Sequence, residues 1–182
     1  MNIYSTNSLN CIFNLKIDSS DLFNKQAIHL IPAEWRLILL NNGSFTQNLN
    51  SLTGQEIKVY QVRAINKEMM RAGRFRYIYL TSYCDKQLAF ARSIWKTERR
   101  NKVNTVIDDK PIGQSFIEYQ ADIYKDIHEI YLMHCAYLEY KFKSNEPIWG
   151  RKYTLHYCNK PIVIVQEFFS PYLINFFNHN KT

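Results

Sequence analysis

Hydrophobic residues in the first third of the chain recur at the spacing of amphipathic helices. This spacing predicts one helix over residues 21–30 and a second over 32–40, with Pro32 as the first residue of the second helix. Ser44 is typical of the N-cap of a third helix, which Gly54 ends. The chain is therefore expected to place helices before its main strands.

After residue 55 the pattern changes to an alternation of polar and apolar residues, which is typical of half-buried strands. Two short polar stretches, at Cys84–Lys86 and Asn159–Lys160, each separate two such runs and predict β-hairpins. Helices followed by strands with tight turns predict an α+β fold: a single antiparallel β-sheet of about six strands, with helices packed on one side. The predicted strands cover residues 56–62, 74–83, 87–96, 128–142, 149–157 and 161–169.

The length of 182 residues and the hydrophobic content of 46% fit a single domain over residues 1–182, in which residues 1–18 form an irregular segment. No run approaches the ~18 apolar residues of a membrane span. The N-terminus lacks both the basic and the apolar stretch of a signal peptide. We therefore expect a soluble monomer that stays in the compartment where it is made.

The formal net charge of +7 favours anionic partners, although scattered basic residues more often form an ordinary solvated surface. No nucleic-acid-binding motif accompanies the charge, so no nucleic-acid partner is expected. The four cysteines and five histidines show no metal-ligand spacing. We expect reduced thiols and no metal site.

Four charged residues fall on strand faces that otherwise carry apolar side chains: Arg76, Arg92, Arg151 and Glu167. Arg92 shares the face of Leu88, Phe90 and Ile94. A buried charge is too costly to leave unpaired, so these residues pair with one another, bind a ligand or face solvent. If they bind a ligand, guanidinium groups suit a planar carboxylate and the apolar neighbours suit a ring.

Six short motifs, taken in order, resemble the chorismate lyase family, and most closely its member encoded in red-algal plastids. They span about residues 32–171 of the chain. The motifs are Asn42–Thr46 (NGSFT), Arg76–Leu80 (RYIYL), Ala91–Ile94 (ARSI), Pro111–Gly113 (PIG), Trp149–Arg151 (WGR) and Glu167–Pro171 (EFFSP).

The resemblance implies an enzyme that converts chorismate to 4-hydroxybenzoate and pyruvate without a metal or organic cofactor. By the same resemblance, Arg76 grips the ring carboxylate and Glu167 meets the hydroxyl end, and these two are the expected catalytic residues. Phe45 and Ile112 would contact the substrate by backbone and packing. Arg92 and Arg151 would hold the enolpyruvyl carboxylate or support the site. A plastid location, in the chloroplast stroma, and a role in quinone biosynthesis are implied as well, with the cytoplasm as the alternative location.

Two other functions stay open at this point. The same fold can serve as an effector-sensing protein that binds a small aromatic acid without catalysis, although this chain shows no DNA-binding helix-turn-helix. An RNA-binding protein is the second, and a strongly salt-dependent affinity for RNA would support it.

Overall fold

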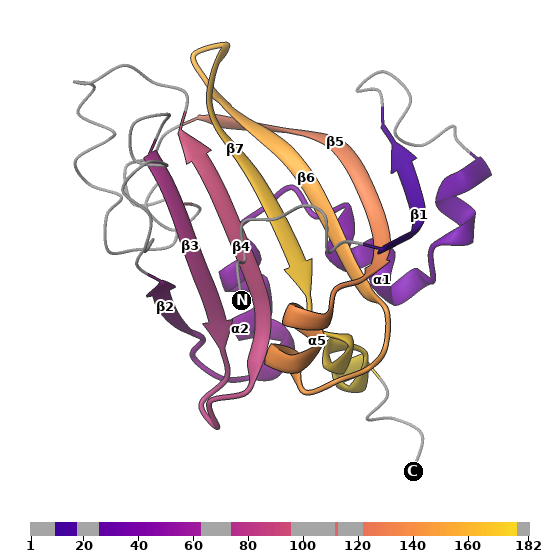
Figure 1. The fold of residues 1–182 in the computed structure, drawn as a ribbon. Helices are drawn as coiled ribbons and strands as arrows, with labels where there is room; N and C mark the ends of the chain where they lie inside the picture. Colours follow the sequence, from indigo (N-terminus) through magenta and orange to yellow (C-terminus); the bar gives the residue numbers. More distant parts are fainter. Residues whose placement is uncertain (1–9, 18–25, 63–73, 96–111, 113–121, 178–182) are drawn as a thin grey trace.

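One antiparallel sheet of seven strands organises the computed structural model, which describes residues 10–17, 26–62, 74–95, 112 and 122–177 (Figure 1). The strands lie in the order β1-β5-β6-β7-β4-β3-β2. The predicted α+β class with a single antiparallel sheet is confirmed. The strands are β1 (Asn10–Lys16), β2 (Lys58–Val62), β3 (Arg74–Thr81), β4 (Gln87–Trp95), β5 (Ile123–His134), β6 (Ile148–Tyr157) and β7 (Lys160–Phe169).

Both predicted hairpins are present. Asp85 adopts a positive φ of 56° in the turn between β3 and β4. In the turn between β6 and β7, Cys158 and Asn159 have φ of 49° and 60°, as the two central residues of a type I′ turn require. The β6–β7 hairpin lies at the centre of the sheet, because β6 pairs with β5 and β7 pairs with β4.

The predicted strand over 128–142 is wrong in its second half. β5 ends at His134, and a helix, α5 (Ala136–Phe142), follows. The Glu139 carboxylate accepts a hydrogen bond from the Cys135 backbone N–H over 3.1 Å and contacts His134 Nδ1 at 2.8 Å. These contacts turn the chain at the end of β5.

The helices α1 (Ala33–Leu39) and α2 (Phe45–Thr53) form where the pattern predicts them, α1 starting one residue after Pro32. The Ser44 hydroxyl caps α2 by accepting from the Gln47 backbone N–H at 3.5 Å, and Gly54 ends it with φ 65°. None of the helices in the described part of the chain is long and apolar enough to cross a bilayer.

Two short 3₁₀ helices complete the described elements: η2 (Gln26–Leu30) and η4 (Pro171–Phe177). The first part of the helix predicted over 21–30 lies outside the described residues. So do residues 113–119 of the segment 112–119, for which the sequence also predicts a short helix, and the basic stretch at 96–102, which we expect to form a loop.

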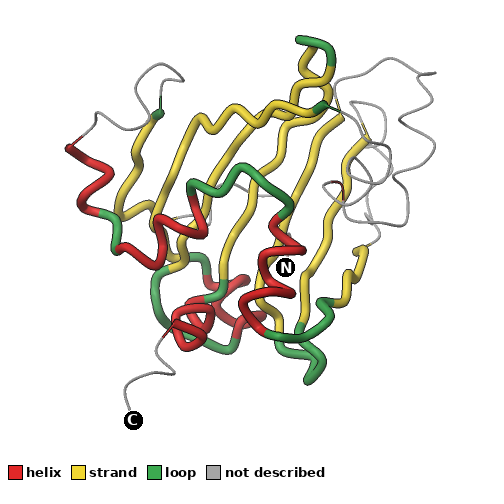
Figure 2. The backbone as a smooth tube through the Cα atoms, turned by 180° about the vertical axis from the view of Figure 1, so that it is seen from behind, coloured by secondary structure: helices red, strands yellow, loops and turns green. Residues whose placement is uncertain are grey.

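Both faces of the sheet are covered, by different elements (Figure 2). α1, α2 and η4 contribute buried apolar residues, among them Ile38, Leu49 and Leu173, to the main core on one face. α5 lies on the opposite face, where Leu138 and Phe142 join a second cluster rich in aromatic residues. The described helices therefore lie on both sides of the sheet, and α5 is the exception to the predicted placement on one side.

Candidate functional site

A cavity of about 230 Å³ lies between the sheet and the segment that joins α1 to α2. Residues 42–46, which include the first turn of α2, line it on one side. β3, β4, β5, β6 and β7 line it on the other. The N–H groups in the first turn of a helix have no acceptor within the helix, so this turn favours negatively charged groups.

Small side chains on β4 create the space. Ala89, Ala91 and Ser93 face the cavity, while the residues that alternate with them point to the other side of the sheet. The side chains on the flanking strands are larger and apolar: Ile78 on β3 lies beside Ala91, and Val165 on β7 lies beside Ser93. A flat ring would therefore lie over the small residues of β4.

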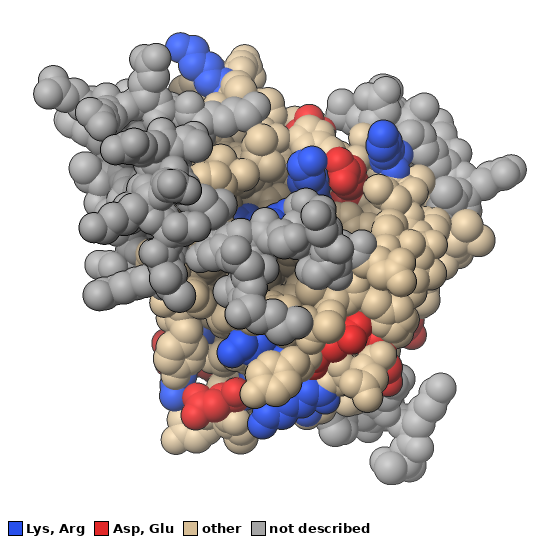
Figure 3. All heavy atoms as spheres, in the orientation of Figure 1, with Lys and Arg blue, Asp and Glu red and all other residues tan. Residues whose placement is uncertain are grey.

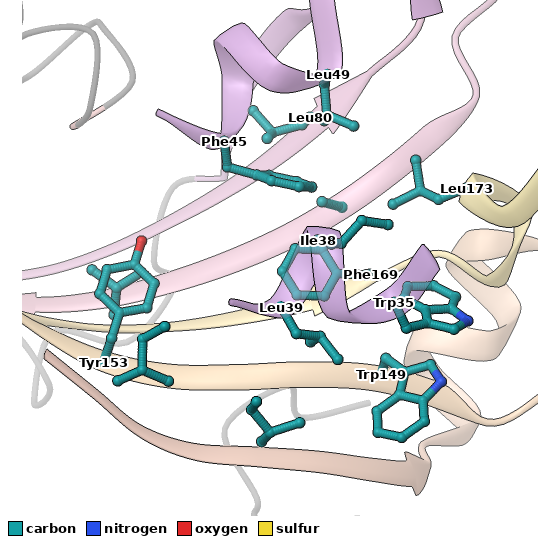
Figure 4. Close-up of a cluster of buried hydrophobic side chains, with 14 of the residues drawn as sticks. Trp35, Ile38, Leu39, Phe45, Leu49, Leu80, Trp149, Tyr153, Phe169 and Leu173 are labelled. Atoms are coloured by element: carbon teal, nitrogen blue, oxygen red, sulfur yellow. The ribbon is translucent and has the colours of Figure 1, made fainter. Parts of the chain in front are cut away.

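Four residues singled out from the sequence line this one cavity: Phe45, Arg76, Ile112 and Glu167. Arg76 and Glu167 are each 7% exposed. β4 separates their two strands, so their backbones lie about 10 Å apart at the usual strand spacing. Phe45 extends from α2 and packs edge to face on Phe169, with ring centroids 4.8 Å apart (Figure 4).

The Glu167 carboxylate is held by two donors. Arg151 Nε donates to Oε2 over 2.7 Å, and the Tyr153 hydroxyl donates to Oε1 over 2.9 Å. Burial raises the pKa of the Tyr153 hydroxyl well above its usual value, and the charge of Glu167 raises it further, so Tyr153 stays a donor. Glu167 is thereby fixed as an acceptor with its remaining lone pairs available to the cavity.

Arg151 is not one of the cavity-lining residues, which favours the second of its two predicted roles, support of the site. Its side chain is fully buried, and Nη1 donates to the carbonyls of Ile38, Leu39 and Asn41 at 2.9–3.0 Å. Those carbonyls lie at the C-terminal end of α1, where helical carbonyls lack partners and a cation is favoured. Arg151 therefore supports the site by joining α1 to Glu167.

Arg92 lies on the face of the sheet opposite the cavity, so of its two predicted roles the position does not favour direct contact with the substrate. Its Nε donates to Gln166 Oε1 at 2.5 Å. On this face Phe90 packs between Tyr79 and Phe168 in the aromatic cluster. Bulky neighbours mark a buried face here, but the cavity forms on the other face, where the side chains are small.

Lys125 on β5 is a cavity-lining residue that the sequence reasoning missed. Its Nζ donates to the carbonyls of Asn41 at 3.2 Å and Gly43 at 2.9 Å, and lies 4.8 Å from the centroid of the Tyr153 ring. Burial lowers the pKa of Lys125 to about 7; the positive charge of Arg151 lowers it further and Glu167 opposes the shift. The sequence analysis began this strand at residue 128, whereas β5 begins at Ile123 and includes Lys125. Lys125 lies two residues before Ile127 and therefore on the same face of the strand, and this spacing was the signal that could have identified it.

The cavity thus combines two cationic side chains, Arg76 and Lys125, with one oriented carboxylate, Glu167. Between these charged groups, apolar and aromatic side chains line the cavity. Such a site can bind a small organic anion, orient it and accept a hydrogen bond from it. No cluster of three His, Cys, Asp or Glu side chains that could hold a metal ion occurs among the described residues.

Comparison with known proteins agrees with the motifs. The family model described as "Chorismate pyruvate-lyase Rv2949c-like" matches residues 39–177. A protein of Antithamnion sp. named "Uncharacterized protein ycf21" is 41% identical over 180 residues, covering 97% of this chain and 98% of that one. A protein of the same name from Porphyra purpurea is 39% identical and covers 80% of this chain and 86% of its own length. The one from Cyanophora paradoxa is 31% identical and covers 86% of this chain and 88% of its own length. The chain belongs to the chorismate pyruvate-lyase Rv2949c-like family.

Proposed function

We propose that this protein removes pyruvate from chorismate to give 4-hydroxybenzoate. One observation carries the proposal: Arg76 on β3 and Glu167 on β7 line the same buried cavity. The one strand between them, β4, presents only small side chains to that cavity. The ring of the substrate would lie over Ala91 and Ser93. Its carboxylate would meet Arg76, and its hydroxyl would meet Glu167.

The reaction needs orientation and charge balance rather than a cofactor. A proton leaves the ring carbon that bears the hydroxyl, and the C–O bond to the enolpyruvyl group breaks. The ring becomes aromatic, and enolpyruvate takes up a proton to become pyruvate. Arg76 and the first turn of α2 would fix the ring carboxylate. Glu167 would be the group that handles the proton, and the buried site would exclude water.

Turnover tests the proposal directly. Purified protein is incubated with chorismate, pyruvate is followed by a coupled lactate dehydrogenase assay, and 4-hydroxybenzoate is followed by chromatography. We expect equal amounts of the two products from the unchanged protein. Arg76→Gln and Glu167→Gln should each lower kcat/KM by about 100-fold or more, since each removes a group that acts on the substrate.

A matched control separates these losses from a general effect of removing charge. Lys152→Met, at the partly exposed pair with Glu129, should keep full activity. A folded protein that releases neither product from chorismate contradicts the lyase assignment.

The second candidate is a protein that binds a small aromatic acid and does not turn it over. It is favoured by the two hydrogen bonds that Glu167 already accepts from Arg151 and Tyr153, because they fix the carboxylate in place as an acceptor for the hydroxyl of a bound ligand. Such a protein would bind 4-hydroxybenzoate but leave chorismate intact. The turnover assay, run beside calorimetry with 4-hydroxybenzoate, distinguishes the two.

An RNA-binding function has less support. On the face in Figure 3, the Lys and Arg side chains of the described residues are scattered, several of them beside Asp or Glu, and form no continuous basic surface. The relatives from algae support the expectation of a plastid location. In that location 4-hydroxybenzoate could enter quinone biosynthesis.

A further inference from the structure

Lys125 lines the cavity at the end away from Arg76, and the proposed reaction has so far assigned it no role. In the strand order, β7 with Glu167 lies between β3 with Arg76 on one side and β5 with Lys125 on the other. Two strand spacings separate the strand of Glu167 from the strand of each cation, and along β7 Glu167 lies two residues beyond the level of Arg76 and four beyond that of Lys125. Across the order of the strands, the cavity therefore carries a basic side chain on each side of its acceptor.

The contacts of Lys125 leave one donor for a ligand. An ammonium group has three N–H donors, and two of them point at the carbonyls of Asn41 and Gly43. Both carbonyls belong to the segment that leads into α2, and the ring of Tyr153 covers another side of the group. The remaining donor can serve an anion in the cavity.

We propose that Lys125 receives the second carboxylate of a dianionic ligand and so makes the site selective for dicarboxylates over monocarboxylates. The inference rests on the proposed function, because it assigns Arg76 to the ring carboxylate and Lys125 to the carboxylate of the enolpyruvyl arm. It replaces the assignment of that arm to Arg92 or Arg151, neither of which lines the cavity.

The surroundings of Lys125 support this role. The charged or titratable groups that face it from the described elements are Arg151 and Tyr153 on β6, Glu167 on β7 and, across the cavity, Arg76. Burial lowers the pKa of Lys125 to about 7, so the amine of the empty site is only partly protonated at neutral pH. A second carboxylate at this position would stabilise the ammonium form and draw in a proton. A monocarboxylate held by Arg76 would not.

The test uses two unreactive probes that differ only in the second carboxylate, 3-(carboxymethoxy)benzoate and 3-methoxybenzoate. Calorimetry at pH 8, in buffers of different ionisation enthalpy, gives both affinity and proton uptake. We expect the unchanged protein to bind the dicarboxylate at least about tenfold more tightly, with additional proton uptake. Lys125→Met should abolish both differences while leaving the affinity for 3-methoxybenzoate within about threefold. Lys125→Arg should keep the selectivity and lose the proton uptake, because arginine is always charged.

Lys152→Met is the matched control and should change neither quantity, since Lys152 pairs with Glu129 outside the cavity. Equal affinities of the unchanged protein for the two probes would overturn the inference, as would a Lys125→Met variant that loses affinity for both probes equally. The latter result would assign Lys125 to loop support alone. Selective binding without turnover of chorismate would leave the inference standing and remove only the lyase activity. Binding of neither probe would overturn the inference, and together with failure to turn over chorismate it would remove the lyase activity as well.

Discussion

Arg151 and Glu167 form a buried ion pair with a 2.7 Å contact, and the same guanidinium binds three carbonyls at the end of α1. The pair therefore joins β6, β7 and α1 in one network. Because Glu167 also lines the cavity, the network connects the stability of the fold to the position of the proposed reactive group.

Replacing Arg151 by Met should cost about 3–5 kcal/mol of unfolding free energy, because it leaves a buried carboxylate without its partner. Urea unfolding followed by tryptophan fluorescence measures the loss. The double variant Arg151→Met with Glu167→Gln should be more stable than the single Arg151→Met variant, since the unpaired charge is gone. Equal stability of the single and double variants would mean that the carboxylate of Glu167, left without its partner, costs little stability.

Stability should rise with pH between 7 and 9 through Lys125. The folded pKa is about 7, below the ordinary 10.5, so in this range the unfolded chain binds more protons than the folded protein. The cost of burying the charge is fully present below pH 7 and is relieved as pH rises towards 10.5. One proton gives a slope of at most about 1.4 kcal/mol per pH unit. The difference in unfolding free energy between the unchanged protein and Lys125→Met, measured at pH 7, 8 and 9, should show this slope, and a flat difference would contradict it.

Gly150→Ala should destabilise the sheet because Tyr131 packs over this glycine. An added Cβ would lie 2.2 Å from Tyr131 Cε2 and 2.7 Å from the Glu167 carbonyl oxygen. Moving the ring would also break the bond from its hydroxyl to the Arg151 carbonyl, so we expect a loss of about 2–4 kcal/mol. Gly43→Ala is the control, since its nearest contact would be an ordinary 3.5 Å. Thermal unfolding of the two variants should differ clearly; similar melting temperatures would argue against the close packing.

Ala91→Leu should fill the cavity without unfolding the protein. Ala91 lies on the sheet between Ile78 and Glu167, and the added side chain would occupy the space assigned to the ring. We expect affinity for 4-hydroxybenzoate to fall by about 100-fold or more while the melting temperature changes little. The same substitution at the exposed Ala136, at the start of α5, should leave binding unchanged. Retained binding in Ala91→Leu would place the ligand elsewhere.

The hairpins and the helix caps were predictable because their signals are local. Ser44 caps the start of α2 and Gly54 ends it, as the chemistry of these residues predicts. In the turn between β6 and β7, Asn159 adopts the positive φ that asparagine tolerates. The boundary at Cys135 was not predictable from apolar content, since residues 128–142 are rich in apolar side chains on both sides of it. The spacing of Cys135, Leu138 and Phe142 is helical, and these three residues are buried in one cluster.

The missed strand β1 and the misplaced Arg92 have a different cause. β1 lies at the edge of the sheet, and five of its seven residues are exposed, so it carries little hydrophobic pattern. For Arg92, alternation predicted correctly that neighbouring residues face opposite sides. The alternation could not tell which of the two buried faces holds the cavity. That depends on α5, which covers the aromatic face and whose position is set by the whole fold.

The central place of the β6–β7 hairpin has a consequence for protein synthesis. β7 leaves the ribosome after the other described strands, yet it pairs with β4, which is made much earlier. A nascent chain that ends before residue 169 lacks the strand that joins the two halves of the sheet, and if it ends before residue 167 it also lacks Glu167. The proposed site includes Glu167 and so can form only after β7 has been made; binding of an aromatic acid to a nascent chain would therefore report that its sheet has closed.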